Sequence, residues 1–142
     1  MRRLLATGDE DAALERLRAD RVGVARDFAV EHQLILVLKG TRTLVAAPDG
    51  RVFVSPTGNA GLGTAGSGDT LTGIITSFNA QAFAALGQEA DALAATLAAV
   101  YVGGMAGDFA ARERGVRTMV ASDIREHLSR SIRALDLKGE LP

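Results

Sequence analysis

The sequence predicts an α/β protein, and three observations indicate this class. Residues 34–38 form a continuous apolar run of strand length, which is typical of a strand buried on both faces in a sheet with helices above and below it. Residues 51–55 alternate apolar and polar side chains, as a strand does. Residues 67–83 and 90–111 carry apolar side chains at helical spacing. Strand patterns followed by long helical patterns place the chain in the α/β class.

Composition narrows the possible functions. The chain has 142 residues, enough for one domain with a core, and its formal net charge of −1 implies no general attraction to nucleic acid or anionic membranes. It has no cysteine, which excludes disulfides and thiolate chemistry. No apolar run of about 18 residues predicts a membrane span, and no signal peptide is seen. We therefore expect a soluble, cytoplasmic protein.

The N-terminal third predicts two structural helices and three strands. Thr7 with Glu10 fits a capping box for a helix over 8–19, and a second helix is expected over 21–31. The second helix is expected to turn four apolar side chains toward a core: Val22, Ala25, Ala29 and Val30. The strand at 34–38 is followed by a hairpin of strands 43–47 and 51–55, joined at the tight-turn sequence Pro48-Asp49-Gly50.

A glycine-rich loop, residues 58–69, is the most informative stretch of the chain. It contains five glycines in twelve residues, ends at Asp69 and runs into a helical pattern. Glycines let a backbone approach a ligand closely, and a helix N-terminus attracts anions, so the loop predicts a phosphate cradle. A carboxylate in such a cradle is suited to take a proton from a substrate hydroxyl. The competing interpretation is a flexible loop with an aspartate cap.

Three helices are expected after this loop. They cover residues 67–83, 90–111 and 123–135, the last with Asp123 and Glu126 as a capping box, and residues 136–142 are expected to fray. Three glycines weaken the second of these helices intrinsically, which indicates tight packing against it: Gly103, Gly104 and Gly107. His32 and His127 are far apart in the sequence, and no metal-ligand cluster is visible, so we predict no metal site formed by side chains.

A longer set of motifs resembles a known family. These are Val37-Leu38-Lys39-Gly40-x-x-Thr43, Pro48-Asp49-Gly50, Gly58-Asn59 and Gly66-Ser67-Gly68-Asp69-x-Leu71-x-Gly73-Ile74-Ile75. Together they resemble the ADP/ATP-dependent NAD(P)H-hydrate dehydratases of the ribokinase-like superfamily. The resemblance extends from the first residues to about residue 135, but it covers only the C-terminal half of that family. It implies a ribokinase-like three-layer α/β/α sandwich that is incomplete, with residues 1–142 forming a single partial domain.

The resemblance implies a repair reaction on nicotinamide cofactors hydrated at C6. The family phosphorylates the added hydroxyl with ADP or ATP, after which phosphate leaves and the ring double bond returns. Lys39, Gly40, Thr41, Arg42 and Thr43 resemble its nucleotide-contacting segment, with Gly68 as a further nucleotide contact. Asp69 resembles the catalytic base that meets the hydrated nicotinamide, and we add Asn59 as a substrate contact. The backbone N–H groups of Gly66, Ser67 and Gly68 are predicted to form the anion hole.

The resemblance also leaves alternatives open. Family members carry about as much chain again upstream, including a His-Pro-x-Glu segment, so we expect a truncated or mis-started chain, or a fragment that needs a complementing N-terminal half or forms a homo-oligomer. A bare strand edge would otherwise be exposed. The alternative functions are a ribokinase-like kinase acting on a vitamin-precursor alcohol and a non-catalytic nucleotide-binding fragment. Mg²⁺ is expected to arrive with the nucleotide.

Overall fold

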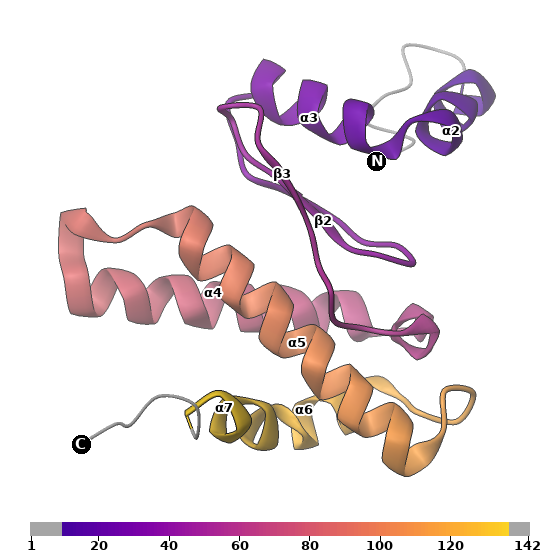
Figure 1. Cartoon of the computed structure of the whole chain (residues 1–142), viewed down its shortest axis with the longest axis vertical. Coiled ribbons are helices and arrows are strands. Elements are labelled where there is room, and N and C mark those ends of the chain that lie inside the picture. Colours follow the sequence, from indigo (N-terminus) through magenta and orange to yellow (C-terminus); the bar gives the residue numbers. More distant parts are fainter. Residues whose placement is uncertain (1–9, 137–142) are drawn as a thin grey trace. The chain divides into compact units, whose positions relative to one another are not determined.

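A computed structural model of the chain describes residues 10–136 (Figure 1). The chain divides into two compact units. The first holds the described residues up to Lys39 together with Thr43–Val54, and the second holds Gly40–Arg42 together with the described residues from Ser55 onward. Thr7 of the predicted capping box and residues 137–142 of the predicted frayed tail lie outside the described residues.

The first unit begins with the two predicted helices. Helix α2 spans Glu10–Ala19 and helix α3 spans Arg21–Glu31. The break falls at Asp20, whose carboxylate accepts a hydrogen bond from the backbone N–H of Gly23 at 2.7 Å. A Cβ on Gly23 would lie 2.2 Å from that carboxylate, so the cap requires glycine there. Both helices and the break between them are confirmed.

The three strands form one antiparallel sheet in the order β1-β2-β3. Strand β1 spans Leu36–Leu38, β2 spans Leu44–Ala46 and β3 spans Val52–Val54. Leu36 pairs with Ala46, and Ala46 pairs with Val52. In the turn between β2 and β3, the carboxylate of Asp49 accepts the backbone N–H of Arg51 at 3.0 Å, and this confirms the predicted hairpin.

Helix α3 packs on this sheet through small side chains, and here two predictions were wrong. Ala25 and Ala29 are fully buried in a cluster with strand residues, but Val22 and Val30 are 45% and 41% exposed. The buried stripe of α3 is centred between Val24 and Ala25, so at 100° per residue Val22 lies beside the stripe and Val30 lies on the opposite face of the helix. The strand at 34–38 was expected to be buried on both faces. Within the described residues β1 pairs only with β2, so it is an edge strand and Leu34 before it is exposed.

The second unit is helical. It contains the 3₁₀ helix η1 at Ala60–Gly63, α4 at Ser67–Leu86, the 3₁₀ helix η2 at Gly87–Glu89, α5 at Ala92–Arg114, α6 at Ala121–Glu126 and α7 at Leu128–Asp136. Figure 1 shows α5 (orange) crossing α4 (pink), and α6 packs against both of them. Helix α4 begins at the predicted residue 67 and ends three residues later than predicted, whereas α5 begins two residues later and ends three residues later than predicted.

The glycines of α5 lie where neighbouring elements approach its backbone. A Cβ on Gly104 would lie 2.3 Å from Oγ1 of Thr57, and one on Gly107 would lie 2.5 Å from Cδ2 of Leu62. Real Cβ atoms do not come this close to other heavy atoms. The prediction of tight packing at these glycines is confirmed.

Helix α5 also corrects the expectation that no segment is long and apolar enough to cross a membrane. Among the described helices, α5 meets that criterion by length and composition. The core helix of a soluble protein meets it equally well, and α5 packs against α4, α6 and α7. Its apolar character is accounted for by these contacts.

The last predicted helix, residues 123–135, is two helices that meet at His127. Helix α6 begins two residues earlier than expected, after Val120. The Asp123 carboxylate accepts the backbone N–H of Val120 at 2.7 Å, so Asp123 occupies the third helical position rather than the N-cap. The predicted capping box of Asp123 with Glu126 was therefore wrong, because the segment starts with a valine that has no side-chain acceptor.

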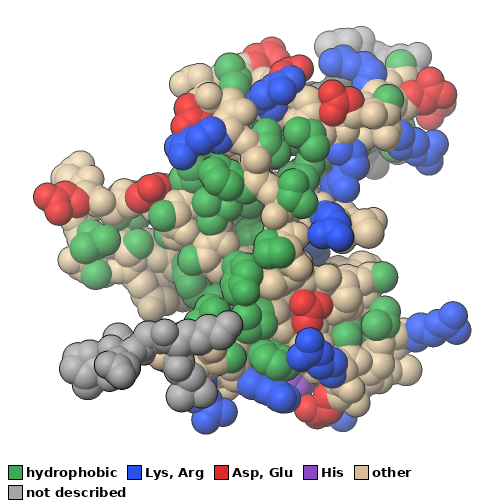
Figure 2. All heavy atoms as spheres, viewed as in Figure 1, with side chains coloured by type: hydrophobic (Ala, Val, Ile, Leu, Met, Phe, Trp, Pro, Cys, Tyr) green, Lys and Arg blue, Asp and Glu red, His purple; other side chains and the backbone are tan. Residues whose placement is uncertain are grey.

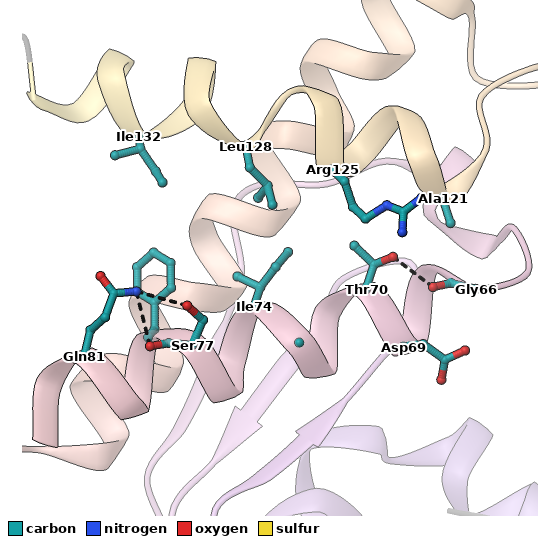
Figure 3. Close-up of a pocket in the computed structure, with 12 residues that line it drawn as sticks. Gly66, Asp69, Thr70, Ile74, Ser77, Gln81, Ala121, Arg125, Leu128 and Ile132 are labelled. Carbon is teal, nitrogen blue, oxygen red and sulfur yellow. Dashed lines mark hydrogen bonds between the residues drawn. The ribbon is translucent and has the colours of Figure 1, made fainter. Parts of the chain in front are cut away.

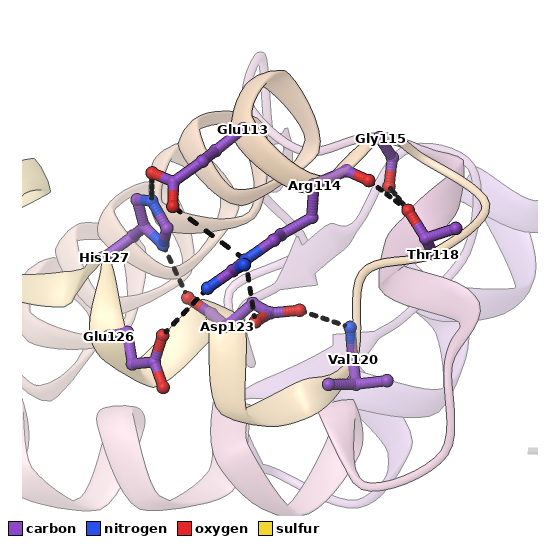
Figure 4. Close-up of polar contacts among 8 residues, drawn as sticks. All are labelled: Glu113, Arg114, Gly115, Thr118, Val120, Asp123, Glu126 and His127. Carbon is purple, nitrogen blue, oxygen red and sulfur yellow. Dashed lines mark hydrogen bonds and ion pairs between the residues drawn. The ribbon is translucent and has the colours of Figure 1, made fainter.

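A polar cluster joins the end of α5 to α6 and α7 (Figure 4). The buried His127 ring lies with Nδ1 2.8 Å from the backbone oxygen of Asp123 and Nε2 3.0 Å from Oε2 of Glu113. Both partners are acceptors when Glu113 is ionised, so the ring satisfies both contacts only as the doubly protonated imidazolium. The Asp123 carbonyl raises the pKa of His127; burial opposes this, and Glu113 adds to it.

The fold is therefore expected to lose stability as the pH rises. A His whose pKa is higher in the folded chain contributes stability that is complete below the unfolded pKa near 6.5 and is lost as pH passes the raised folded pKa. Arg130 also faces this cluster, as does Arg114, which pairs with Glu126. Urea unfolding between pH 6 and pH 8.5 should show the free energy of unfolding falling with pH, and His127→Gln should flatten this dependence.

His32→Gln, at the exposed end of α3, is the matched control and should leave the pH dependence of the unfolding free energy intact. An unchanged pH dependence in His127→Gln contradicts the role given to His127.

Candidate active site

The glycine-rich loop is fixed to α5 at its start. The backbone N–H of Gly58 donates to Oδ2 of Asp108 at 3.0 Å, and Nδ2 of Asn59 donates to Oδ1 of the same carboxylate at 2.9 Å. Gly58 has a φ of +103°, which favours glycine. Asp108 is thus the anchor of the loop. Sequence reasoning missed this role, because the partners are about 50 positions apart in the chain.

Asn59, which we predicted to contact substrate, is used in the structure to hold the loop. Besides Asp108, its Nδ2 donates to the backbone oxygen of Gly107 at 2.9 Å. Its Oδ1 accepts the backbone N–H of Gly61 at 2.9 Å and so caps η1. Both amide hydrogens are committed, which leaves one lone pair of Oδ1 for a ligand. Its role in substrate binding stays a prediction.

The end of the loop is fixed as firmly as its start. Gly66, with φ +79°, is the N-cap of α4, and a Cβ there would lie 3.2 Å from Cβ of Ala121. Ser67 is buried, and its Oγ donates to the backbone oxygen of Leu62 at 2.6 Å. These contacts argue against a merely flexible loop.

The first turn of α4 presents amide groups that can bind an anion. The Ser67 amide donates to the Thr64 oxygen at 3.3 Å, and the Thr70 amide donates to the Gly66 oxygen at 3.0 Å. Between them, the structure records no bond from the amides of Gly68 and Asp69 within residues 10–136, as is usual for a first helical turn. Of the predicted anion hole, Gly68 therefore offers its amide directly, and the Ser67 amide is already engaged.

Asp69 follows at the third position of α4. Its side chain is exposed, and no hydrogen bond or ion pair of its carboxylate is recorded within the described part of the chain. In Figure 3 the carboxylate points away from Arg125. A carboxylate beside available helix amides can both accept a proton and border a bound phosphate.

The predicted nucleotide segment, residues 39–43, connects β1 to β2; residues 39–42 are exposed and Thr43 is half-buried. The backbone oxygen of Lys39 accepts a hydrogen bond from Nη2 of Arg21 at 3.3 Å. Lys39 and Thr43 belong to the first unit, while Gly40–Arg42 belong to the second unit with Gly68. Residues 39–43 lie between the two predicted strands, and Gly68 lies at the start of the predicted helix. That they bind one nucleotide together stays a prediction.

No group of three or more potential metal-ligating side chains occurs among the described residues. Three carboxylates at the end of α5 and on α6, Glu113, Asp123 and Glu126, are paired with Arg114 at 3.8, 3.6 and 4.0 Å. The side chains of the site therefore offer a metal ion no ready-made set of ligands.

The fold places the chain in a structural class. It superposes on the crystal structure of the ADP/ATP-dependent NAD(P)H-hydrate dehydratase from Bacillus subtilis, co-crystallised with ATP and Mg²⁺, with a TM-score of 0.73 and 34% sequence identity. The match covers 83% of this chain and 40% of that one. The structure is thus an α/β fragment that matches part of a ribokinase-like fold.

The chain belongs to the NAD(P)H-hydrate dehydratase family, whose sequence profile matches residues 2–130. It is 44% identical over 140 residues to the bifunctional NAD(P)H-hydrate repair enzyme Nnr of Moorella thermoacetica. It is 34% identical over 117 residues to the ADP-dependent (S)-NAD(P)H-hydrate dehydratase of Bacillus subtilis. The chain spans 24% of the first protein and 40% of the second.

Proposed function

We propose that this chain carries the phosphoryl-transfer part of a nucleotide-dependent NAD(P)H-hydrate dehydratase, with Asp69 as its base. The observation that carries the proposal is the exposed Asp69 carboxylate at the N-terminus of α4, beside the Gly68 amide and after a loop anchored at both ends. Family membership supplies the substrate class, a nicotinamide cofactor hydrated on its ring.

Asp69 takes the proton of the ring hydroxyl as the hydroxyl oxygen attacks the terminal phosphoryl group of ADP or ATP. The bond from that phosphorus to the bridging oxygen breaks, and the nucleotide leaves one phosphate shorter. The amide of Gly68 and the positive end of α4 stabilise charge on the transferring group. Phosphate then leaves the ring carbon as the neighbouring carbon loses a proton, which restores the double bond.

Mg²⁺ supplied with the nucleotide would offset phosphate charge. The described side chains form no cluster to hold the ion alone, so the nucleotide phosphates themselves would carry it. The predicted nucleotide contacts are residues 39–43 and Gly68. The Bacillus subtilis relative is named as an ADP-dependent enzyme, and it was co-crystallised with ATP and Mg²⁺.

Two other functions have support of their own. A small-molecule kinase would use the same cradle and base, but the family match over residues 2–130 favours the dehydratase. A non-catalytic nucleotide-binding fragment would use the Gly68 amide at the start of α4 without proton transfer by Asp69. Cytoplasmic location and action on small molecules alone, with no nucleic-acid or membrane partner, remain part of this proposal.

The test is a turnover assay with three readouts. Loss of hydrated NADH that depends on ADP or ATP supports the dehydratase, and a stable phosphorylated alcohol supports the kinase. Nucleotide binding without either product supports the non-catalytic fragment. The assay is run on the chain alone and on the chain co-expressed with the part of the Bacillus subtilis dehydratase that it does not match. Absence of cofactor repair in both forms contradicts the proposal.

A further inference from the structure

Arg21 differs from the other arginines of helices α2 and α3. Figure 2 shows Lys and Arg side chains (blue) at the surface over these helices. Arg16, Arg18 and Arg26 are exposed, whereas Arg21 is half-buried. Removing part of a guanidinium from water costs free energy unless its N–H groups find acceptors. The half-buried position of Arg21 therefore requires an acceptor within the fold.

That acceptor is the backbone of Lys39, 18 positions further along the chain. Nη2 of Arg21 donates to the backbone oxygen of Lys39 at 3.3 Å. Within residues 10–136 no ion pair of Arg21 is recorded, and the carboxylate of the adjacent Asp20 bonds to the Gly23 amide instead. A hydrogen bond with a charged donor is stronger than one between neutral groups. The bond therefore joins the start of α3 to the chain just after β1.

The energetics of the helix itself do not explain an arginine at this position. Arg21 is the first residue of α3, and the first turn of this helix contains no acidic residue. A cation there lies at the positive end of the helix dipole, which disfavours it. The contact with Lys39 accounts for an arginine that the helix alone would not favour.

Lys39 begins the connection that we predict to contact the nucleotide. Strand β1 ends at Leu38, which pairs with Leu44, so residues 39–43 lie outside the sheet. Within the described part of the chain, no backbone hydrogen bond of residues 40–42 is recorded. A segment with few bonds of its own loses conformational freedom when a ligand orders it. The bond from Arg21 restrains this segment at the point where it leaves the strand.

We propose that Arg21 is a positioning residue of the nucleotide site. By holding the Lys39 carbonyl, it fixes the direction in which residues 39–43 leave β1, so the connection meets ADP or ATP already ordered. The inference rests on the proposed function, which supplies the nucleotide. Without the bond, the free energy of ordering the connection is paid when the nucleotide binds. The role of Arg21 therefore concerns nucleotide affinity and not proton transfer by Asp69.

The experiment compares Arg21→Met with Arg26→Met, a matched change of an exposed arginine on the same helix that pairs with Asp27. Trypsin cleaves after lysine and arginine, so cleavage after Lys39 and Arg42 reports how readily the connection opens. The cleavage rates are measured by mass spectrometry without nucleotide. The ADP dissociation constant is measured by calorimetry, on the chain alone and on the chain co-expressed with the unmatched part of the Bacillus subtilis dehydratase.

Arg21→Met should speed cleavage at both sites and raise the ADP dissociation constant about 3- to 10-fold, the cost of ordering a released segment. At saturating ADP its rate of cofactor repair should equal that of the wild-type chain, because the substitution leaves Asp69 and the start of α4 unaltered. Arg26→Met should change neither the cleavage rates nor the ADP affinity.

Equal cleavage of Arg21→Met and the wild-type chain would overturn the inference, because the connection would then not depend on this bond. Faster cleavage with unchanged ADP affinity would also overturn it, since the connection would then not determine nucleotide binding. If the wild-type chain binds no ADP in either form, the proposed function fails and the inference fails with it; the cleavage rates, which need no nucleotide, distinguish this from failure of the inference alone. Circular dichroism checks that each variant is folded, and Arg21→Gln decides the outcome if Arg21→Met is not.

Discussion

Asp69→Asn is expected to lower cofactor-repair turnover by about 10²- to 10⁴-fold, the range that a general base contributes. Asparagine keeps the size of the side chain and removes only its ability to take a proton at neutral pH. The nucleotide dissociation constant should stay nearly unchanged, because the amides at the start of α4 are backbone groups that the substitution does not alter. The measurements are the initial rate of hydrated-NADH loss and nucleotide binding by calorimetry. They are made on the chain alone or on the co-expressed form, whichever shows cofactor repair.

A matched substitution separates loss of the base from loss of a surface charge. Asp27→Asn changes an exposed carboxylate on α3 and should leave turnover intact. Full activity in Asp69→Asn would show that another group takes the proton. A large loss of nucleotide affinity in Asp69→Asn would instead place Asp69 among the residues that position the nucleotide.

The sequence predicted the positions of the elements well where a local rule governs them. The hairpin follows from turn chemistry at Pro48-Asp49-Gly50, and the break between α2 and α3 falls at Asp20, a capping residue. The start of α4 at Gly66-Ser67 follows from a glycine with positive φ and the helical pattern behind it. In each case the deciding contact is made within a few residues.

Predictions that depended on tertiary contacts were less successful. Val22 and Val30 are as apolar as the residues that α3 buries, but only the position of the sheet decides which face of the helix is covered. His127, at the break between α6 and α7, contacts Glu113, which lies on another helix. The anchoring of the loop by Asp108 depends on a contact between residues about 50 positions apart, and periodicity carries no information about such a contact.

The glycines of the second unit allow the packing argument to be tested as a series. Gly73, Gly103 and Gly104 all lie within long helices and none has a positive φ, so alanine should gain about 1 kcal/mol of helix propensity at each. Their surroundings differ. A Cβ on Gly73 meets nothing within 4 Å, and one on Gly103 lies 3.3 Å from the side-chain ends of Leu71 and Ile74.

Gly104→Ala is expected to be the most damaging of the three. Its Cβ would lie 2.3 Å from Oγ1 and 2.9 Å from the carbonyl carbon of Thr57, so the Thr57 backbone has to move. The movement would also strain the hydrogen bond from Thr57 Oγ1 to the Tyr101 oxygen, now 2.9 Å. The cost of overpacking and of the lost hydrogen bond together exceeds the gain in helix propensity. The free energy of unfolding should therefore fall by about 1–3 kcal/mol.

In urea unfolding, the stability of the three variants should therefore fall in the order Gly73→Ala, Gly103→Ala, Gly104→Ala. Gly73→Ala should be more stable than wild type by about 0.5–1 kcal/mol. A uniform shift in one direction would mean that helix propensity dominates and that the close approach of Thr57 to α5 is not real. Thr57 immediately precedes Gly58, the first residue of the loop that Asp108 anchors. Gly104→Ala should thus also reduce turnover at temperatures where the variant is still folded, because the same displacement moves the start of the loop that leads to Asp69.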